Sequence, residues 1–277
     1  AVPSASVVGA PCGGLCVRGC AVCFAHHATR STLACGHALT AVDEVNAYYY
    51  PPLQEVRIAD IGTRPSYRFV SADSSEAGAL AAAAGIERFD FILHLAAQAG
   101  VRYAVSHPDA YTRANLVGHA NVLEFARHHE SLKHLIYASS SSVYGNDTTP
   151  PFSEEANAVM PVSYYGATKR SCELLSHSYS SLYGLPQTGL RFFTVYGPWG
   201  RPDMAYWSFT DAILRGRGVP VFGGGKLRRD FPYVDDISAL LVRIVETPFA
   251  GSASDAPHRF STLGNAPPAS VLAPRSG

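Results

Sequence analysis

Short apolar runs alternate with longer amphipathic stretches from about residue 38 onward, and this alternation limits most strongly what the chain can fold into. We expect strands at 38–43, 67–73, 89–97, 134–145 and 187–198, and helices at 109–129 and 164–183. The run at 89–97 is apolar at nearly every position, which is typical of a strand covered on both faces. Strands and helices in this order predict an α/β fold with a doubly wound parallel sheet of the Rossmann type.

Polar residues stand where several of these strands end. Asp43 and Asp73 close two of them, and four serines at 139–142 follow the apolar residues of a third. In open parallel sheets, the carboxyl ends of the strands border the crevice that binds ligands. The pattern therefore predicts a nucleotide site at that edge of the sheet.

Charge and composition argue against several classes of partner. The 22 basic residues balance 22 acidic ones, which favours neither nucleic acid nor an anionic membrane. No apolar run approaches the roughly 20 residues of a membrane helix, and the opening residues lack the charged and apolar parts of a secretory signal. We therefore expect a cytoplasmic protein. Because the chain starts at Ala1 rather than Met, we also expect a fragment or a processed form.

The cysteines concentrate at the amino end of the chain. The spacing of Cys16, Cys20 and Cys23 is that of radical S-adenosylmethionine enzymes, in which three thiolates hold an iron–sulfur cluster. Nothing further along the chain supports such a barrel. We interpret these thiols as incidental and reduced, and we expect no metal site.

Tyr165 and Lys169 are four residues apart at the start of a predicted helix, so both project from one face. A phenol is a poor base at neutral pH, and an ammonium group one turn away favours its ionised form. A hydroxyl of the serine run could hydrogen-bond the same substrate oxygen. Alone, this spacing is common among surface pairs, but its setting beside the predicted crevice favours a catalytic pair.

Four segments together resemble the signature segments of extended short-chain dehydrogenase/reductases, the NAD-dependent epimerase/dehydratase family. They are ASSSSVYG (138–145), PVSYYGATK (161–169), LRFFTVYGPWGRPDMA (190–205) and RRDFPYVDDI (228–237). HLAAQAGVRYA (94–104) and the YYYP after Asp43 are similar to the UDP-glucuronate 4-epimerases of that family. The resemblance covers roughly residues 38–240, with the motifs in the order and spacing of the family.

The resemblance implies a reaction with NAD as cofactor and a UDP-sugar as substrate. Tyr165 would remove the proton from the sugar 4-hydroxyl while a hydride passes to NAD. Lys169 would hold the nicotinamide ribose, and Ser140 would polarise the reacting oxygen. The 4-keto sugar would then rotate and take the hydride back on its other face, so NAD stays bound. Because family members are often dimers, the resemblance also implies a homodimer.

The resemblance further implies which residues contact the two ligands. The cofactor contacts would be Gly9, Gly13, Asp43, Asp73, Ala96, Ala97, Gln98, Asn115, Tyr165 and Lys169. The substrate contacts would be Ser141, Ser142, Arg191, Thr194, Arg201 and Arg229. Arginine suits phosphate because its planar group can donate two hydrogen bonds at once.

Ser141 and Ser142 help to choose among the reactions of the family. Its dehydratases and decarboxylases carry acidic residues near this place, because they need an acid and a base beyond Tyr165. Serines cannot do this at neutral pH, but they can hydrogen-bond a carboxylate. This favours 4-epimerisation of UDP-glucuronate to UDP-galacturonate. Two alternatives stay open: another nucleotide sugar, such as UDP-glucose, and a catalytically silent homologue.

The amino end departs from the family. Members begin with an apolar strand and Gly-x-x-Gly-x-x-Gly, whose backbone admits a pyrophosphate. Residues 7–20 offer Gly9, Gly13, Gly14 and Gly19 in another spacing, and Asp43 follows Gly9 by 34 residues rather than roughly 20. Residues 10–36 also lack an amphipathic helix pattern. Our hypothesis is that this stretch is translated out of frame or mis-spliced.

Two domains are expected. Residues 1–195 would form the NAD-binding Rossmann-type domain, with 1–37 atypical, and residues 196–277 a smaller substrate-binding lobe. The lobe is expected to be incomplete, because the family continues for several dozen residues past 258–268, and 233–247 is expected to pack back on the first domain.

Overall fold

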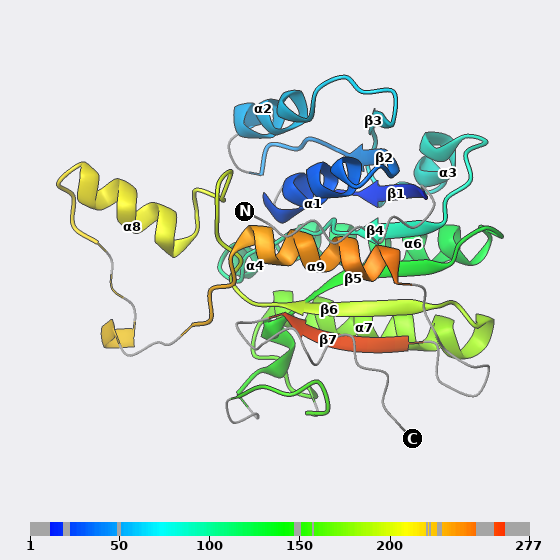
Figure 1. Ribbon diagram of the computed structural model, residues 1–277. Coiled ribbons are helices and arrows are strands. Elements are labelled where there is room, and N and C mark those ends of the chain that lie inside the picture. Colours follow the sequence, from blue (N-terminus) through cyan, green and yellow to red (C-terminus); the bar gives the residue numbers. More distant parts are fainter. Residues whose placement is uncertain are drawn as a thin grey trace.

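Seven parallel strands form a single sheet in the order β3-β2-β1-β4-β5-β6-β7 (Figure 1). The computed structural model describes residues 12–18, 23–48, 51–146, 151–156, 158–219, 221, 223–225, 229–247 and 258–263. The strands are β1 Gly13–Val17, β2 Ala38–Asp43, β3 Tyr67–Ser71, β4 Phe91–His94, β5 His134–Ser140, β6 Gln187–Phe192 and β7 His258–Leu263. The strand order reverses between β1 and β4, which places the ligand crevice there. The predicted doubly wound α/β fold is therefore confirmed.

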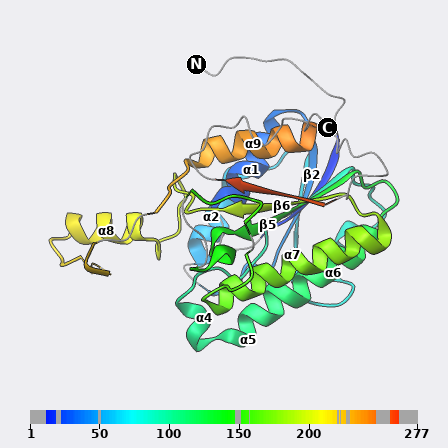
Figure 2. The same ribbon diagram turned by 90° about the horizontal axis from the view of Figure 1, so that it is seen from below.

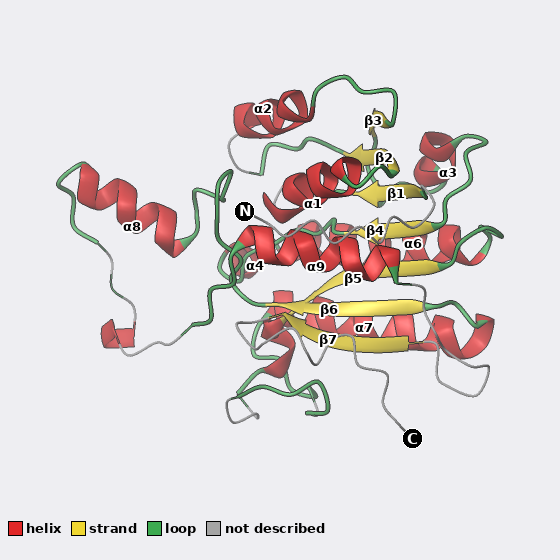
Figure 3. Ribbon diagram, in the orientation of Figure 1, coloured by secondary structure: helices red, strands yellow, loops and turns green. Residues whose placement is uncertain are grey.

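Helices cover both faces of the sheet (Figures 2 and 3). They are α1 Cys23–Ala34, α2 Pro51–Ile61, α3 Ala79–Ala84, α4 Tyr103–Ser106, α5 Pro108–Tyr111, α6 Gly118–Arg127, α7 Tyr164–Tyr183, α8 Ala205–Leu214 and α9 Val234–Glu246. One core lies under α1 and α9, with Phe24 and Leu241 in it, and the other lies under α3 and α6, with Leu80 and Leu123. Among the described residues, none of the helices is both long and apolar enough to cross a membrane.

The structure corrects the prediction for the amino end. Gly13–Val17 is a central strand that pairs with β2 and β4, and α1 follows it. Gly14 is required there because a Cβ would lie 2.2 Å from Cζ of Phe91 on β4. Part of this stretch thus takes a regular place in the fold, as the inner strand β1 and the helix α1. The hypothesis of an out-of-frame segment stays a hypothesis about the transcript, for resequencing to test.

The sequence pattern did not predict helix α1, because several of the residues that the helix buries are small or polar. The buried residues of α1 are Phe24, Ala25, His26, Ala28, Thr29, Thr32 and Leu33. The Thr29 hydroxyl donates to the carbonyl of Ala25 at 2.7 Å, so this buried hydroxyl is satisfied within the helix. A hydropathy pattern counts such threonines as surface residues, which hides the amphipathic character of the helix.

The expected division after residue 195 does not divide the sheet. Strand β7 pairs with β6, from Gln187 with His258 to Phe192 with Leu263, and α9 packs against α1. Helix α8 lies to one side, away from the sheet (Figure 1). Ala212 is the buried residue of α8.

Candidate functional site

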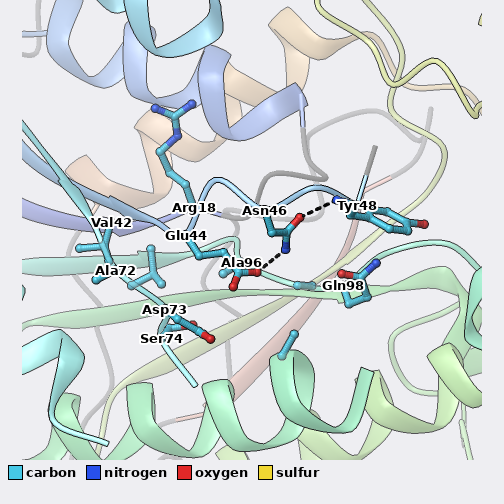
Figure 4. Close-up of a pocket in the computed structure, with 13 residues that line it drawn as sticks. Arg18, Val42, Glu44, Asn46, Tyr48, Ala72, Asp73, Ser74, Ala96 and Gln98 are labelled. Atoms are coloured by element: carbon cyan, nitrogen blue, oxygen red, sulfur yellow. Dashed lines mark hydrogen bonds between the residues drawn. The ribbon is translucent and has the colours of Figure 1, made fainter. Parts of the chain in front are cut away.

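A cleft opens at the carboxyl ends of β1 to β4, where the strand order reverses (Figure 4). The empty space between its walls, counted together with the solvent at its mouth, is about 440 Å³. Its lining residues are Val17, Arg18, Val42, Glu44, Asn46, Tyr48, Ala72, Asp73, Ser74, Ala96, Ala97, Gln98 and Ala114. Four predicted cofactor contacts, Asp73, Ala96, Ala97 and Gln98, therefore come together in one cleft.

The segment after β4 is fixed from three sides. Asn115 accepts the Gln98 amide at 2.8 Å and donates to the Gln98 carbonyl at 3.1 Å and to Thr168 Oγ1 at 3.0 Å. Tyr48 and Tyr111 donate their hydroxyls to the carbonyl of Ala99 at 2.6 and 3.0 Å. Asn115 lies in a π-helical turn, η1 Thr112–Val117, and is fully buried. Its amide holds the wall of the cleft rather than facing into it.

The acidic residues Glu44 and Asp73 line the cleft, and Asp43 stands next to Glu44 without being one of the lining residues. Asp43 is buried at the end of β2 and accepts the Val45 amide at 3.3 Å. Burial raises the pKa of Glu44 above its ordinary value. Burial alone would also raise the pKa of Asp73, but hydrogen bonds from Ser75 and the nearby Arg113 guanidinium outweigh it and hold that pKa low. Asp73 therefore stays ionised, with both oxygens already committed.

The cleft suits a dinucleotide. A buried acid after the second strand is the group that accepts ribose hydroxyls in sheets of this type. The Nε2 atom of Gln98 is buried and has no hydrogen-bond partner among the described residues. A bound ligand that offers an acceptor would satisfy it, since buried polar groups are almost always paired. The residues present thus fit NAD.

The start of α7 brings Tyr165 to the end of β5. Ser163 caps the helix by accepting the Gly166 amide at 3.0 Å. Gly166 permits close contact with the serine run, because a Cβ there would lie 2.7 Å from the carbonyl oxygen of Ser142. Burial raises the pKa of Tyr165, while a hydrogen bond with Ser140 and the charge of Arg201 act to lower it. The phenol and the Ser140 hydroxyl therefore meet.

Lys169 lies one turn further along α7 and is 3% exposed. Its ammonium donates to the carbonyl of Ala138 on β5 at 2.7 Å. Burial lowers the pKa of Lys169, and the nearby Cys172 and Glu173 oppose that shift. The charge of Arg201 also acts on Tyr165, in the direction that favours the phenolate.

The predicted substrate contacts differ in how exposed they are and in which elements carry them. Ser141 and Ser142 begin a 3-10 turn, η2 Ser141–Tyr144, that follows β5, and both are partly exposed. Thr194 follows β6 and its amide donates to the carbonyl of Asp230 at 3.3 Å. Arg201 is 9% exposed and its Nε donates to Asp203 at 2.9 Å. Arg229 is exposed.

Two predicted contacts are corrected by their positions. Gly13 begins β1 at the opposite edge of the sheet, where its amide donates to Asp90 at 2.9 Å. Arg191 is 2% exposed and forms a bidentate pair with the buried Glu173, at 2.8 and 3.0 Å. Neither residue can reach a ligand in the crevice. Gly9 lies outside the described residues.

Several cleft residues were not predicted. Arg18 directly follows β1, and its side chain points toward α1, where Nη1 donates to Tyr67 at 3.3 Å (Figure 4). Glu44, Asn46 and Tyr48 follow Asp43 along the chain. The signal that could have found them is adjacency to the end of β2. Arg18 was missed because no strand was predicted before it.

Comparison with known proteins agrees with this geometry. Residues 16–257 match the model of the NAD dependent epimerase/dehydratase family. Protein CapI of Staphylococcus aureus is 42% identical over 267 residues, which cover 92% of this chain and 79% of that protein. A probable UDP-glucuronate 4-epimerase of Rhizobium meliloti (strain 1021) is 44% identical over 232 residues, covering 84% and 68%.

A solved structure gives the same picture in three dimensions. UDP-glucuronic acid 4-epimerase from Bacillus cereus, in complex with UDP-glucuronic acid and NAD, superposes with a TM-score of 0.81. The two sequences are 29% identical, and the match covers 91% of this chain and 77% of that one.

Proposed function

Because this chain belongs to the NAD dependent epimerase/dehydratase family, we propose that it inverts carbon 4 of UDP-glucuronate to give UDP-galacturonate. The observation that carries the proposal is the meeting of Tyr165 with Ser140 at the carboxyl end of β5, beside a cleft that fits NAD. Relatives described as UDP-glucuronate 4-epimerases support the choice of sugar.

Tyr165 is the acid and base of the proposed reaction. Burial keeps its phenol protonated in the free protein, and the hydrogen bond with Ser140 and the charge of Arg201 reduce the cost of ionising it. In the ionised form it takes the proton from the sugar 4-hydroxyl, and it returns that proton after the sugar has turned. NAD, when bound, supplies the hydride acceptor and donor for carbon 4.

Lys169 and Gln98 are the proposed contacts of the cofactor NAD. The ammonium of Lys169 is fixed by Ala138 and keeps two further donor positions for the nicotinamide ribose. Gln98 contributes its unpaired Nε2 to the cleft, on a segment that Asn115 fixes. Both groups are in place before a ligand binds, which lowers the entropic cost of orienting it.

The serines favour a uronic acid. Ser141 and Ser142 offer hydroxyl donors beside Tyr165, and the segment 138–145 that carries them contains no acidic residue. Hydrogen bonds to a carboxylate are stronger than those to a neutral group. We therefore expect UDP-glucuronate to be preferred over UDP-glucose.

The test is conversion of UDP-glucuronate by the purified chain with NAD, followed by chromatographic separation of the two UDP-uronates. Tyr165→Phe should lower the rate by about 10²- to 10⁴-fold, the usual share of a general acid and base, without weakening NAD binding. Tyr164→Phe is the matched control, because Tyr164 is 44% exposed and only its hydroxyl, bonded to Thr112, is lost.

NAD binding and the choice of UDP-sugar distinguish the proposed function from a silent homologue and from an epimerase of another sugar. A silent homologue would show no rise in melting temperature with NAD, whereas ligand at a hundred times its Kd adds about 2.7 kcal/mol of stability. Conversion of UDP-glucose, with none of UDP-glucuronate, would assign a different sugar. Full activity of Tyr165→Phe would remove the proposed mechanism.

A further inference from the structure

The turn that precedes Arg201 has an unusual backbone. Residues 197–200 form a reversal in which the Gly200 amide donates to the Gly197 carbonyl at 3.2 Å. Pro198 takes the second place of this turn and Trp199 the third, with φ of 61°. Positive φ at that place is usual for glycine and rare for a bulky side chain. The surrounding structure must therefore hold Trp199 in this conformation.

Helices α1 and α2 supply the contacts that hold it. His27 on α1 donates from Nε2 to the carbonyl of Pro198 at 3.0 Å. Arg57 on α2 donates from Nη2 to the carbonyl of Trp199 and is 3% exposed. The ring of His26 lies across the indole of Trp199, with centroids 5.7 Å apart. Both central carbonyls of the turn are thus bound by side chains more than 140 residues earlier in the sequence.

The turn leads directly into Arg201. The guanidinium of Arg201 lies against the segment after β4, where a Cβ on Gly100 would be 3.4 Å from Nη2. Burial raises the pKa of Tyr165, Tyr48 and Tyr111, and the charge of Arg201 opposes that rise at each of them. A shift of the turn would therefore move the positive charge that favours the Tyr165 phenolate.

We propose that Arg57 is a positioning residue that sets where Arg201 stands in the active site. The proposal rests on the proposed function, since it assigns to α2 the placement of a group beside Tyr165. Arg57 suits this task because its cation is buried between the two helices and the turn, so its hydrogen bond to Trp199 is not exchanged for one with water. His27 contributes the second, weaker restraint from a partly exposed site.

The experiment compares Arg57→Met with Arg57→Lys, which keeps a donor for Trp199. Arg57→Met should raise the KM for the UDP-sugar by up to about tenfold, because the turn before Arg201 loses a hydrogen bond from a charged group. It should also move the acidic limb of the pH–rate profile to higher pH, because Arg201 no longer lowers the pKa of Tyr165. Arg57→Lys should restore most of both changes, and NAD binding should change less than about threefold in either variant.

The control is Arg30→Met. Arg30 lies on α1 and pairs with Asp60 at 3.1 Å, but it is half exposed and does not contact the turn. If Arg57→Met does not fold, His27→Ala tests the same turn at a partly exposed site, and it should shift KM and the pH profile in the same direction by less. Wild-type protein that neither binds UDP nor converts a UDP-sugar would remove the proposed function. Wild-type activity combined with unchanged KM and pH profile in the folded variants would overturn the role of Arg57 alone.

Discussion

At the scale of single residues, Arg191 and Arg201 show how much the environment decides. Both occur in one segment whose sequence suggests ligand-binding arginines. Arg191 is enclosed by the rings of Tyr144 and Phe260, 4.8 and 4.7 Å from its guanidinium carbon, and its charge is balanced by Glu173. Burial opposes its ionisation, yet the hydrogen bonds of Glu173 hold the pKa of Arg191 above its ordinary value. The ion pair of Arg191 with Glu173 therefore stabilises the packing of β6 against α7.

Arg191→Met should therefore act on stability. Removal of one partner of a buried ion pair leaves the other charge uncompensated and costs about 3–5 kcal/mol. We expect the free energy of unfolding in urea to fall by that order, with little change in the KM of the folded fraction. The double variant Arg191→Met, Glu173→Gln should recover part of the loss. A large rise in KM with an unchanged free energy of unfolding would contradict this prediction and would indicate that Arg191 binds the substrate.

At the scale of elements, the site depends on the contact between η2 and the first turn of α7. The two elements approach closely at Gly166 and bring Ser140 and Tyr165 together. The amphipathic pattern predicted α7 at its observed bounds, Tyr164–Tyr183. The pattern carries no information on how near the helix lies to the serine turn, because that distance depends on packing.

Gly166→Ala tests this contact. The new Cβ would lie 2.7 Å from the Ser142 carbonyl, so the two elements must separate. We expect a loss of about 1–3 kcal/mol in the free energy of unfolding, as for overpacked cores, and a fall in kcat because Ser140 moves from Tyr165. Ala167→Ser, at the exposed neighbouring position, should leave both quantities unchanged. A Gly166→Ala variant with normal kcat would show that the close approach is not needed for catalysis.

At the scale of the whole molecule, buried histidines link stability to pH. Burial lowers the pKa of His26, His134 and His258 to about 4 and that of His119 to about 3. They lie on both faces of the sheet, in hydrogen bonds such as that of His258 with the Tyr137 hydroxyl at 2.8 Å. Each remains neutral in the fold at pH values where the unfolded chain would bind a proton.

The free energy of unfolding should therefore fall as the pH drops from about 6.5, the pKa of an unfolded histidine, toward 4. The unfolded state gains protons over this range and the folded state does not, so each histidine contributes a slope of up to about 1.4 kcal/mol per pH unit. Urea denaturation at several pH values measures it. His258→Gln should flatten the slope, whereas His128→Gln should not, because His128 is 67% exposed. A pH-independent free energy of unfolding across this window would contradict the prediction.

The sequence by itself determined the strands β2 to β6, the helix that carries Tyr165 and the edge at which polar residues meet. These features are periodic or adjacent along the chain, so local patterns record them. It did not predict β1 and α1. Gly14 is needed because Phe91 of the neighbouring strand lies against it, and α1 buries threonines such as Thr29, which bonds within the helix.

Only the tertiary structure decided which arginine faces the crevice, which charge acts on Tyr165 and how α2 holds the turn before Arg201. These relations join residues that are far apart in sequence, and burial and hydrogen bonding set them in space. A guanidinium group has the same chemistry in every sequence context, and its role follows from the neighbours that the fold brings to it.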